Sequence, residues 1–151
     1  MRTSFFTRFV VTFTIALLAP AAQCADFMTF GGVSYHFDRD LDLNEVNPGI
    51  GFERDVEKNW SWSAGVFKNS LRRAAFYGLA NYAAWKPTDS WRVGVSVGAS
   101  SGYHHAAIIP VVTPFVEWRG DKLAVQTYII PTMKPYVDGA VVLQFKWQLD
   151  K

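Results

Sequence analysis

A histidine and a serine stand where base-assisted acyl transfer could take place. His36 lies near the end of an alternating stretch, 28–38, and Ser70 directly follows another, 59–69. A hydroxyl is a weak nucleophile unless a nearby base accepts its proton, so an imidazole beside a hydroxyl is the minimum for this chemistry. The residues alone also fit a plainer interpretation, in which both are ordinary polar side chains in contact with water.

The composition limits the classes of protein to which the chain can belong. It has 151 residues, 16% of them aromatic, and a formal net charge of +2. The length predicts one domain after removal of a leader. No run of Lys and Arg stands out, which argues against nucleic acid as a partner. No segment beyond the leader reaches the roughly 18 continuous apolar residues of a spanning helix, so a membrane role would have to come from strands.

Residues 1–25 predict a cleaved signal peptide. Two arginines flank its start, a short apolar run interrupted only by threonines follows, and small residues precede the expected cleavage site after Ala25. Residues 26–151 then form one β-barrel domain without cysteine, which excludes disulfides and thiol catalysis. The alternatives are an uncleaved anchor, for which the apolar run is short, and a lipoprotein modified at Cys24, although Gln23 occupies the place of a small residue.

Beyond the leader, segments of about ten residues alternate with polar turns, and this is the length of a transmembrane strand. An even number of strands is typical of bacterial single-chain barrels. No helical period competes over stretches of this length. We therefore predict an all-β fold, an eight-stranded antiparallel transmembrane β-barrel, with strands over 28–38, 47–56, 59–69, 73–86, 90–100, 106–118, 122–131 and 136–148.

Alternation with a period of two is clearest in the segments 90–100, 122–131 and 136–148. In the first of these, every second residue is Trp, Val or Ala, and the residues between them are Arg, Gly or Ser. A soluble antiparallel sheet with one wet face would alternate in the same way, so a periplasmic sandwich or a lipocalin-like barrel is the alternative. The leader and the tryptophans near strand ends favour a barrel in lipid; these are Trp60, Trp62, Trp85, Trp91, Trp118 and Trp147.

The lengths of the connections predict which end of the barrel faces outward. Links at 57–58, 87–90 and 119–121 are short, whereas those at 39–46, 70–72, 101–105 and 132–135 are on average longer and more polar. Outer-membrane barrels place short turns in the periplasm and longer loops outside. His36, Asn69 and Ser70 should therefore lie at or near the outer rim.

Strand alternation also predicts which side chains enter the lumen. His36 falls on the same face as Phe30 and Ser34, and Asn69 falls on the small, mixed face of its strand, so both should point inward. An eight-stranded barrel is either filled by its side chains or holds one small ligand. Small residues at inward positions favour a slot for one acyl chain; these are Gly65, Gly94, Ser96, Gly98, Ala124 and Ala140.

Three prolines predict a break in the barrel wall. Proline cannot donate to a strand ladder, so Pro110, Pro114 and Pro131 predict a local gap between the sixth and seventh strands. The alternative is that these prolines simply end strands.

Four motifs follow one another over most of the mature chain. They are Tyr35-His36-Phe37, Asn59-Trp60 with Phe67-Lys68-Asn69-Ser70, Ile109-Pro110-Val111-Val112-Thr113-Pro114, and Gln126-Thr127-Tyr128-Ile129-Ile130-Pro131. Together they resemble the outer-membrane lipid A palmitoyltransferases of the PagP family. In that family the first motif carries the essential histidine, the second reads Asn-Trp…Phe-Lys-Asp-Ser with a catalytic Asp-Ser, and the last two form the proline-spaced sixth strand and the end of the seventh.

The resemblance implies roles for three residues. His36 would act as the base, Ser70 would be a second essential polar residue, and Asn69 stands where the family has an aspartate. An amide can orient a hydroxyl or a lipid headgroup by hydrogen bonds, but it cannot stabilise an imidazolium as a carboxylate does. The chain also departs from the family in having little room for its N-terminal amphipathic helix and in lacking a final aromatic residue.

The reaction implied by the resemblance moves a fatty acyl chain, palmitoyl in the family, from a phospholipid to lipid A. The gap at the prolines would admit lipid from the outer leaflet. Arg72 and Arg73 could contact lipid A phosphates, because arginine suits bidentate recognition of phosphate. We expect a monomer in the bacterial outer membrane, with no cofactor and no metal. His104-His105 is a weak metal signal, since adjacent strand residues face opposite ways.

Other functions stay open from the sequence. A lipid A deacylase would use water in place of the acceptor hydroxyl, although no His-x-Ser strand motif of that family is evident. A small structural or adhesive barrel would make no use of the rim residues, because a fold does not fix a function. The acidic run Asp38, Asp40, Asp42 and Glu45 fits a solvated loop, or a site for divalent ions that bridge lipopolysaccharide phosphates.

Overall fold

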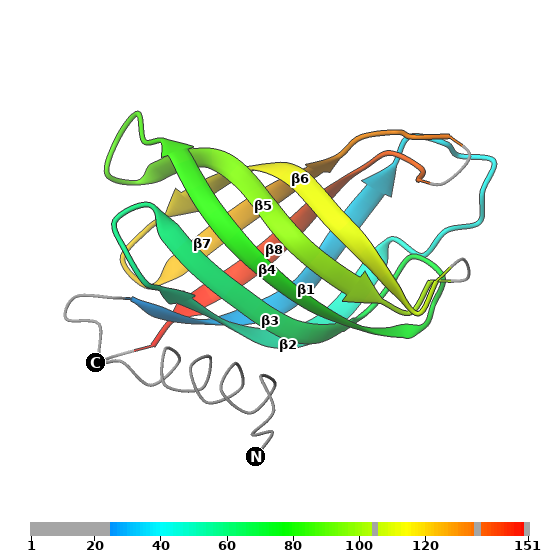
Figure 1. Cartoon of the computed structure of the whole chain (residues 1–151), viewed down its shortest axis with the longest axis horizontal. Coiled ribbons are helices and arrows are strands. Elements are labelled where there is room, and N and C mark those ends of the chain that lie inside the picture. Colours follow the sequence, from blue (N-terminus) through cyan, green and yellow to red (C-terminus); the bar gives the residue numbers. More distant parts are fainter. Residues whose placement is uncertain (1–24, 104–105, 135–136, 150–151) are drawn as a thin grey trace, which may run out of the picture.

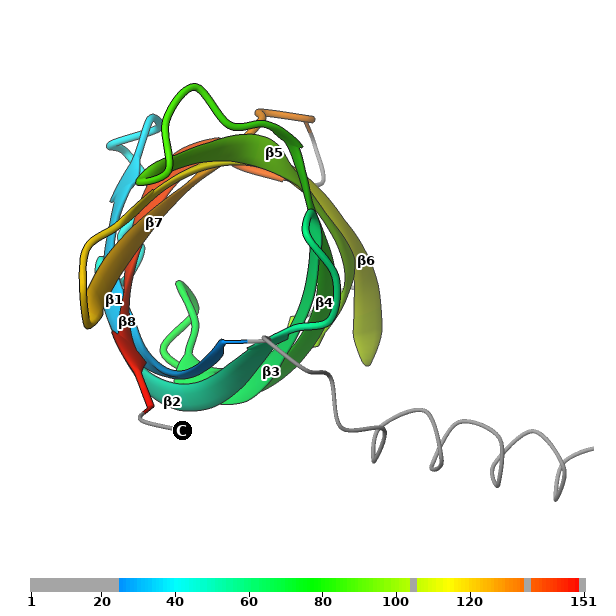
Figure 2. The same ribbon diagram turned by 90° about the vertical axis from the view of Figure 1, so that its left-hand side faces the viewer.

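The chain folds into a closed antiparallel barrel of eight strands. The computed structural model describes residues 25–103, 106–134 and 137–149. The strands pair in sequence order, and β8 closes the barrel onto β1 (Figures 1 and 2). They are β1 (Asp26–His36), β2 (Val46–Asp55), β3 (Trp60–Lys68), β4 (Ala74–Trp85), β5 (Trp91–Ser101), β6 (Ile108–Arg119), β7 (Leu123–Ile130) and β8 (Ala140–Gln148).

The predicted fold class is confirmed, and every predicted segment overlaps one strand. The largest difference is at β8, which begins at Ala140 rather than at residue 136. The predicted signal peptide lies outside the described residues apart from Ala25. Among the described residues, no helix is long and apolar enough to cross a membrane.

The two ends of the barrel differ in their connections. Short turns at 56–59, 86–90 and 120–122 join the strands at the end where β1 begins and β8 ends, which we call the turn end. Longer connections, on average, lie at the opposite end, which we call the loop end, and they span 37–45, 69–73, 102–107 and 131–139. In Figure 1 the turn end is on the left and the loop end on the right. The predicted division into short and long connections is therefore confirmed.

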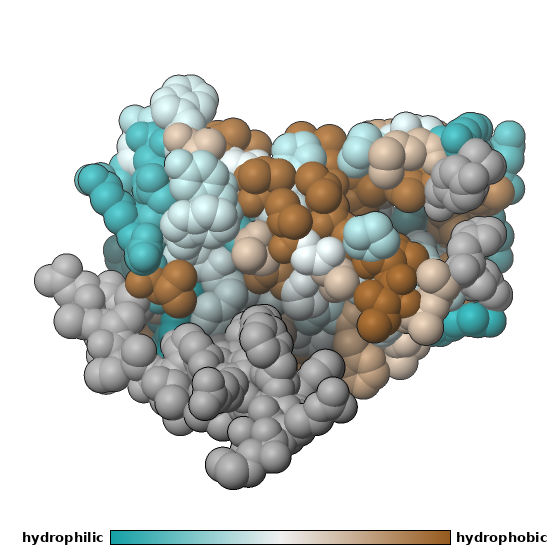
Figure 3. Space-filling view, in the orientation of Figure 1, coloured by the Kyte–Doolittle hydropathy of each residue, from teal (hydrophilic) through white to brown (hydrophobic). Residues whose placement is uncertain are grey.

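The outer surface of the barrel is apolar along every strand. Each strand exposes at least one large apolar side chain: Val33, Ile50, Val66, Phe76, Val97, Val112, Ile129 and Phe145. Figure 3 shows apolar residues gathered between two more hydrophilic ends. The buried side chains are instead largely polar, including Glu53, Asn81, Glu117, Gln126 and Lys146. A soluble barrel would bury apolar side chains, so this inverted arrangement is that of a transmembrane barrel.

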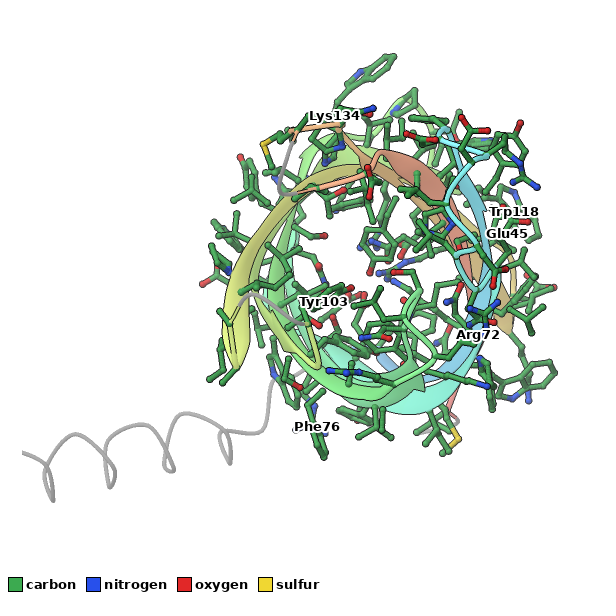
Figure 4. All side chains as sticks on the ribbon, turned by 90° about the vertical axis from the view of Figure 1, so that its right-hand side faces the viewer. Glu45, Arg72, Phe76, Tyr103, Trp118 and Lys134 are labelled. Carbon is green, nitrogen blue, oxygen red and sulfur yellow. The ribbon has the colours of Figure 1, made fainter. Side chains whose placement is uncertain are left out.

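Exposed aromatic side chains lie at both ends of the apolar surface. Five tryptophans form a girdle at the turn end, and three other aromatic residues, Tyr35, Phe37 and Phe76, lie toward the loop end. Trp118 and Phe76 both point away from the lumen in Figure 4. Girdles of this kind mark the two interfaces between a bilayer and water. The tryptophans are Trp60, Trp85, Trp91, Trp118 and Trp147.

A β-bulge in β1 places Phe30 on the outer face of the barrel, whereas the sequence predicted that it points into the lumen. The register against β8 shifts between Phe30 and Val33, because β1 carries one extra residue there. The extra residue reverses the alternation, so Phe30 is 41% exposed on the outer surface while Ser34 and His36 are buried in the lumen. Gly31 and Gly32 let the backbones of the neighbouring strands come close to β1 at this shift. A Cβ at Gly32, for example, would lie 1.6 Å from the carbonyl oxygen of Leu143 in β8.

The lumen is divided into a charged half and a hollow half. Toward the turn end it is filled by a network of ion pairs among Glu53, Asp55, Arg92, Glu117, Arg119 and Lys146. Toward the loop end it holds a cavity of about 390 Å³. A slot was predicted, but of the six small residues proposed to form it, Ala140 alone lines the cavity. Several of the others are small because a backbone passes close by, as at Gly98, where a Cβ would lie 2.0 Å from a carbonyl oxygen.

Candidate functional site

The cavity is closed on the side of the turn end by four polar side chains. Thr29 Oγ1 lies 2.9 Å from the hydroxyl oxygen of Tyr77, and Gln144 donates a hydrogen bond of 3.3 Å to the same oxygen. Tyr128 donates to the amide oxygen of Gln144 at 3.3 Å. All four residues line the cavity, and they separate it from the charge network. The remaining lining is mostly apolar, which suits an alkyl chain.

His36 ends β1 and brings an imidazole to the mouth of this cavity. The residue is 6% exposed and lines the cavity. Its Nδ1 atom is buried without a hydrogen-bond partner and lies 4.0 Å from Glu45 Oε1. The backbone N–H of His36 donates to the same carboxylate oxygen at 3.4 Å. The predicted inward position of His36 is thus confirmed.

Glu45 is held as a carboxylate in the loop that follows β1. Arg39 donates a hydrogen bond to Glu45 Oε1 and, together with the backbone N–H of His36, lowers the pKa of Glu45. The backbone carbonyl of Glu45 accepts the N–H of Ser34 at 2.8 Å, which fixes this part of the loop against β1. The sequence predicts only that Glu45 belongs to an acidic run, in a solvated loop or in a site for divalent ions, and its contact with His36 depends on the fold of the loop.

Ser70 lies on the same cavity, in the turn between β3 and β4. The residue lines the cavity together with its neighbour Leu71 and with Leu43 of the 37–45 loop. Its carbonyl accepts the backbone N–H of Asn44 at 2.8 Å, so the two connections are joined at this point. His36 ends β1 and Ser70 follows β3. The structure therefore brings the two residues together in the lining of one cavity at the loop end.

Asn69 is buried as predicted, but its amide is used by the turn. The residue is 0% exposed and does not line the cavity. Its Oδ1 accepts the backbone N–H groups of Leu71 and Arg73, each at 3.0 Å. Its Nδ2 donates to the carbonyl of Gly102 at 2.9 Å, and so ties the turn to the end of β5. These bonds orient the backbone that carries Ser70.

Changing Asn69 to aspartate is expected to destabilise the barrel. A carboxylate keeps the two accepted hydrogen bonds but cannot donate to Gly102, whose carbonyl oxygen would then face a negative oxygen. We expect Asn69→Asp to lower the free energy of unfolding by about 1–3 kcal/mol, the cost of a buried polar group left without its partner. Urea titration of the barrel in detergent micelles measures this loss. Asn59→Asp, at the turn end, is the matched control, and equal stability of both variants would contradict the assignment.

The two arginines after Ser70 lie at the surface of the loop end. Arg72 adopts a positive φ of 60° and donates to the backbone carbonyl and the carboxylate of Asp42, at 2.8 and 2.9 Å. Arg73 is exposed, and its backbone is bonded to Asn69. Figure 4 looks onto the loop end and shows Arg72 and Glu45 on the same side of the mouth. The guanidinium group of Arg72 is thus paired with Asp42, and Arg73 is exposed at the loop end.

The predicted gap between β6 and β7 is present toward the loop end. β6 pairs with β5 from Ile108 to Trp118, but with β7 only from Phe115 to Arg119. The residues 108–114 therefore have no β7 ladder partner, and the two strands diverge toward the right of Figure 1. The divergence begins at Pro114, which agrees with the inability of proline to donate.

The cavity reaches the barrel wall at this gap. Its lining includes residues 109–113 of β6 and, across the gap, Ile130 and Pro131. Pro110 is among the lining residues, whereas Pro114 is not. A single side-chain bond bridges the strands here, from Thr113 Oγ1 to the carbonyl of Ile129 at 2.9 Å. Two of the three prolines are thus part of the cavity, and the third marks where normal pairing begins.

A tyrosine also lies at the mouth of the cavity. Tyr103 lines the cavity from the end of β5, and burial raises the pKa of its hydroxyl, which keeps it neutral. It is labelled in Figure 4. Within the described ranges, no group of three His, Cys, Asp or Glu side chains is arranged to hold a metal ion. His104 and His105 lie outside the described residues.

Comparison with known proteins identifies the architecture. No family model and no curated protein matches the sequence. Among solved structures, the chain is similar to one described as "De novo design of transmembrane beta-barrels", with a TM-score of 0.62 and 15% identity over 82% of this chain and 95% of that one. It is also similar to the solution NMR structure of the de novo designed TMB2.3, with a TM-score of 0.62 and 9% identity over 85% and 97% of the two chains. The fold is that of a transmembrane β-barrel.

Proposed function

We propose that this barrel is an outer-membrane acyltransferase that moves a fatty acyl chain from a phospholipid to lipid A. The observation that carries the proposal is the cavity, which is largely apolar, opens at the loop end and has both His36 and Ser70 in its lining. Its volume of about 390 Å³ is that of a site for one small ligand. The resemblance to the PagP family, set out above, supplies palmitoyl as the expected acyl group.

The gap between β6 and β7 supports a membrane lipid as the ligand. Residues on both sides of the gap line the cavity, so an acyl chain in the surrounding bilayer has a lateral route to it. The exposed side chains beside this route, such as Ile108, Val112 and Ile129, are apolar. With the termini in the periplasm, the loop end lies at the outer leaflet, where lipid A is found.

The proposed reaction exchanges one ester for another. His36 takes the proton from a hydroxyl of lipid A, and the resulting oxygen attacks the ester carbonyl carbon of the phospholipid. The bond from that carbon to the glycerol oxygen breaks, and His36 returns the proton to the departing lysophospholipid. Ser70 is placed to hydrogen-bond the reacting oxygens at the cavity mouth. Arg72 and Arg73 face the lipid A phosphates, and the enzyme acts as a monomer without a cofactor.

Mass spectrometry of lipid A tests this function directly. We expect cells that express the protein to contain lipid A species heavier by one acyl chain than those of matched cells lacking the gene. Lysophospholipid should accumulate in the same cells, because each transfer leaves one behind. Loss of an acyl chain would instead indicate deacylation, with water as the acceptor. Unchanged lipid A in cells with the folded barrel would favour a structural or adhesive role.

A further inference from the structure

His36 has a buried nitrogen that the fold leaves without a hydrogen-bond partner. The atom is Nδ1, and His36 as a whole is 6% exposed. Buried polar atoms in native proteins are nearly always paired, and each exception calls for an explanation. The nearest charged group is the carboxylate of Glu45, with its Oε1 4.0 Å away. This distance is too long for a hydrogen bond, but it lets the carboxylate attract the imidazole whenever the ring is protonated.

Three charged groups bear on the His36 ring. They are the carboxylates of Glu45 and Asp138 and the guanidinium group of Arg39. Glu45 is the closer of the two carboxylates, and Arg39 donates a hydrogen bond to its Oε1 atom. Asn69, at the position of the family's aspartate, is committed to Leu71, Arg73 and Gly102 and does not line the cavity. The site therefore has a carboxylate, but it comes from the loop after β1.

We propose that Glu45 is the positioning residue of the proposed acyltransferase site, accepting a hydrogen bond from Nδ1 of His36. The bond one ring nitrogen makes decides which nitrogen carries the proton of a neutral imidazole. Glu45 thus keeps the proton on Nδ1 and leaves Nε2 as the base toward the cavity. It also stabilises the imidazolium that forms when Nε2 takes a proton. This inference rests on the proposed function for its kinetic consequences, but not for its geometry.

The loop can shorten the contact when the cavity is filled. Leu43, two residues before Glu45, lines the cavity, so an acyl chain that packs against Leu43 also acts on the position of Glu45. Catalytic hydrogen bonds are often long in unliganded structures and tighten in the substrate complex. A contact of 4.0 Å in the free barrel is therefore compatible with a hydrogen bond during the reaction.

Kinetics of the full-length barrel in detergent–lipid micelles separate positioning from a purely structural role. We expect Glu45→Gln to lower kcat by about 10- to 100-fold, as for loss of a hydrogen bond to a charged group, with little change in KM. The acidic limb of its pH–rate profile should move to lower pH, because the imidazolium loses a neighbouring negative charge. Glu45→Asp, which keeps the charge, should restore part of the rate.

Two control variants make the kinetic test specific. Asp40→Asn removes a negative charge from the same loop at an exposed position outside the cavity, and it should leave the rate unchanged. Arg39→Gln breaks the pair with Glu45 but keeps the carboxylate, and it should retain most of the rate. If Arg39→Gln is as slow as Glu45→Gln and neither changes the pH profile, Glu45 merely braces the loop and the proposal is wrong.

Nitrogen NMR of the imidazole tests the geometry without any turnover. In the folded barrel with phospholipid in its cavity, we expect neutral His36, identified by the signals lost in His36→Gln, to carry its proton on Nδ1, and Glu45→Ala to move the proton toward Nε2. A proton on Nε2 in the wild-type barrel would overturn the role of Glu45, whatever the activity. The expected tautomer together with unchanged lipid A in cells would leave the role of Glu45 standing and reject the acyltransferase.

Discussion

Changing His36 to glutamine is expected to reduce acyl transfer to lipid A by about 10²–10⁴-fold, the usual contribution of a general base. Glutamine keeps a polar side chain of similar length but cannot accept and return a proton at neutral pH. The imidazole is buried in the lining of the cavity, and the proposed reaction needs it beside the ester of a lipid whose acyl chain lies inside. Ser70→Ala should also be strongly impaired, since Ser70 lines the same cavity as His36.

The His36 test depends on showing that the variants fold. Heat-modifiable migration on electrophoresis distinguishes a closed barrel from an unfolded chain, and His36→Gln should keep it, because the eight-stranded ladder does not use this side chain. Ser101→Ala removes a hydroxyl at the same end that does not line the cavity, and it serves as the control for Ser70. Full activity of both His36→Gln and Ser70→Ala would show that the chemistry takes place elsewhere or not at all.

The barrel could be predicted from the sequence because lipid and lumen impose opposite demands on alternate residues. β5, for example, sends Val97 outward and Ser96 inward, and such pairs recur around the barrel. The shift in β1 could not be read from that pattern, since one extra residue at a glycine pair exchanges the two faces. Ser34 and His36 lie beyond the extra residue and point inward as predicted, whereas Phe30 lies before it and was placed on the wrong face.

The candidate site was predicted less completely than the fold, because loops decide its details. The inward direction of Asn69 follows from alternation, but its three bonds to the backbone depend on the path of the turn and on the end of β5. Glu45 looked like one of several solvated acids, and no local pattern shows that its carboxylate returns to His36. The gap at β6 was predictable, by contrast, because proline removes donors wherever it stands.

The buried charge network was not predicted either, although its members lie at inward positions of their strands. Lys146 is 0% exposed and donates to Glu117 and, at 2.7 Å, to Glu53. Arg119 bonds to both of these carboxylates and to Asp55. With Arg92 beside Asp55, the network contains three acidic and three basic side chains. Their charges balance, so the lumen carries them without a net charge in its interior.

Removing Lys146 is expected to be the most damaging single change to the stability of the barrel. Lys146→Met keeps a long side chain but leaves three buried carboxylates with two guanidinium groups, and Glu53 and Glu117 each lose one cationic partner. Breaking a buried ion pair by removing one partner typically costs about 3–5 kcal/mol, because the remaining charge stays desolvated. We expect a loss of this size in the free energy of unfolding, measured by urea titration in detergent micelles.

Two further variants separate the loss of charge balance from the loss of a lysine as such. Lys134→Met breaks an exposed ion pair with Asp38 at the loop end, where solvent screens the charges, and it should unfold like the wild type. Lys146→Met combined with Glu117→Gln removes one charge of each sign and should recover much of the stability, since the network is again balanced. If Lys146→Met alone unfolds at the wild-type urea concentration, water in the lumen already solvates the carboxylates, and the network contributes little to holding the barrel closed. If the double variant is no more stable than the single one, the lysine acts through its own packing and not through its charge.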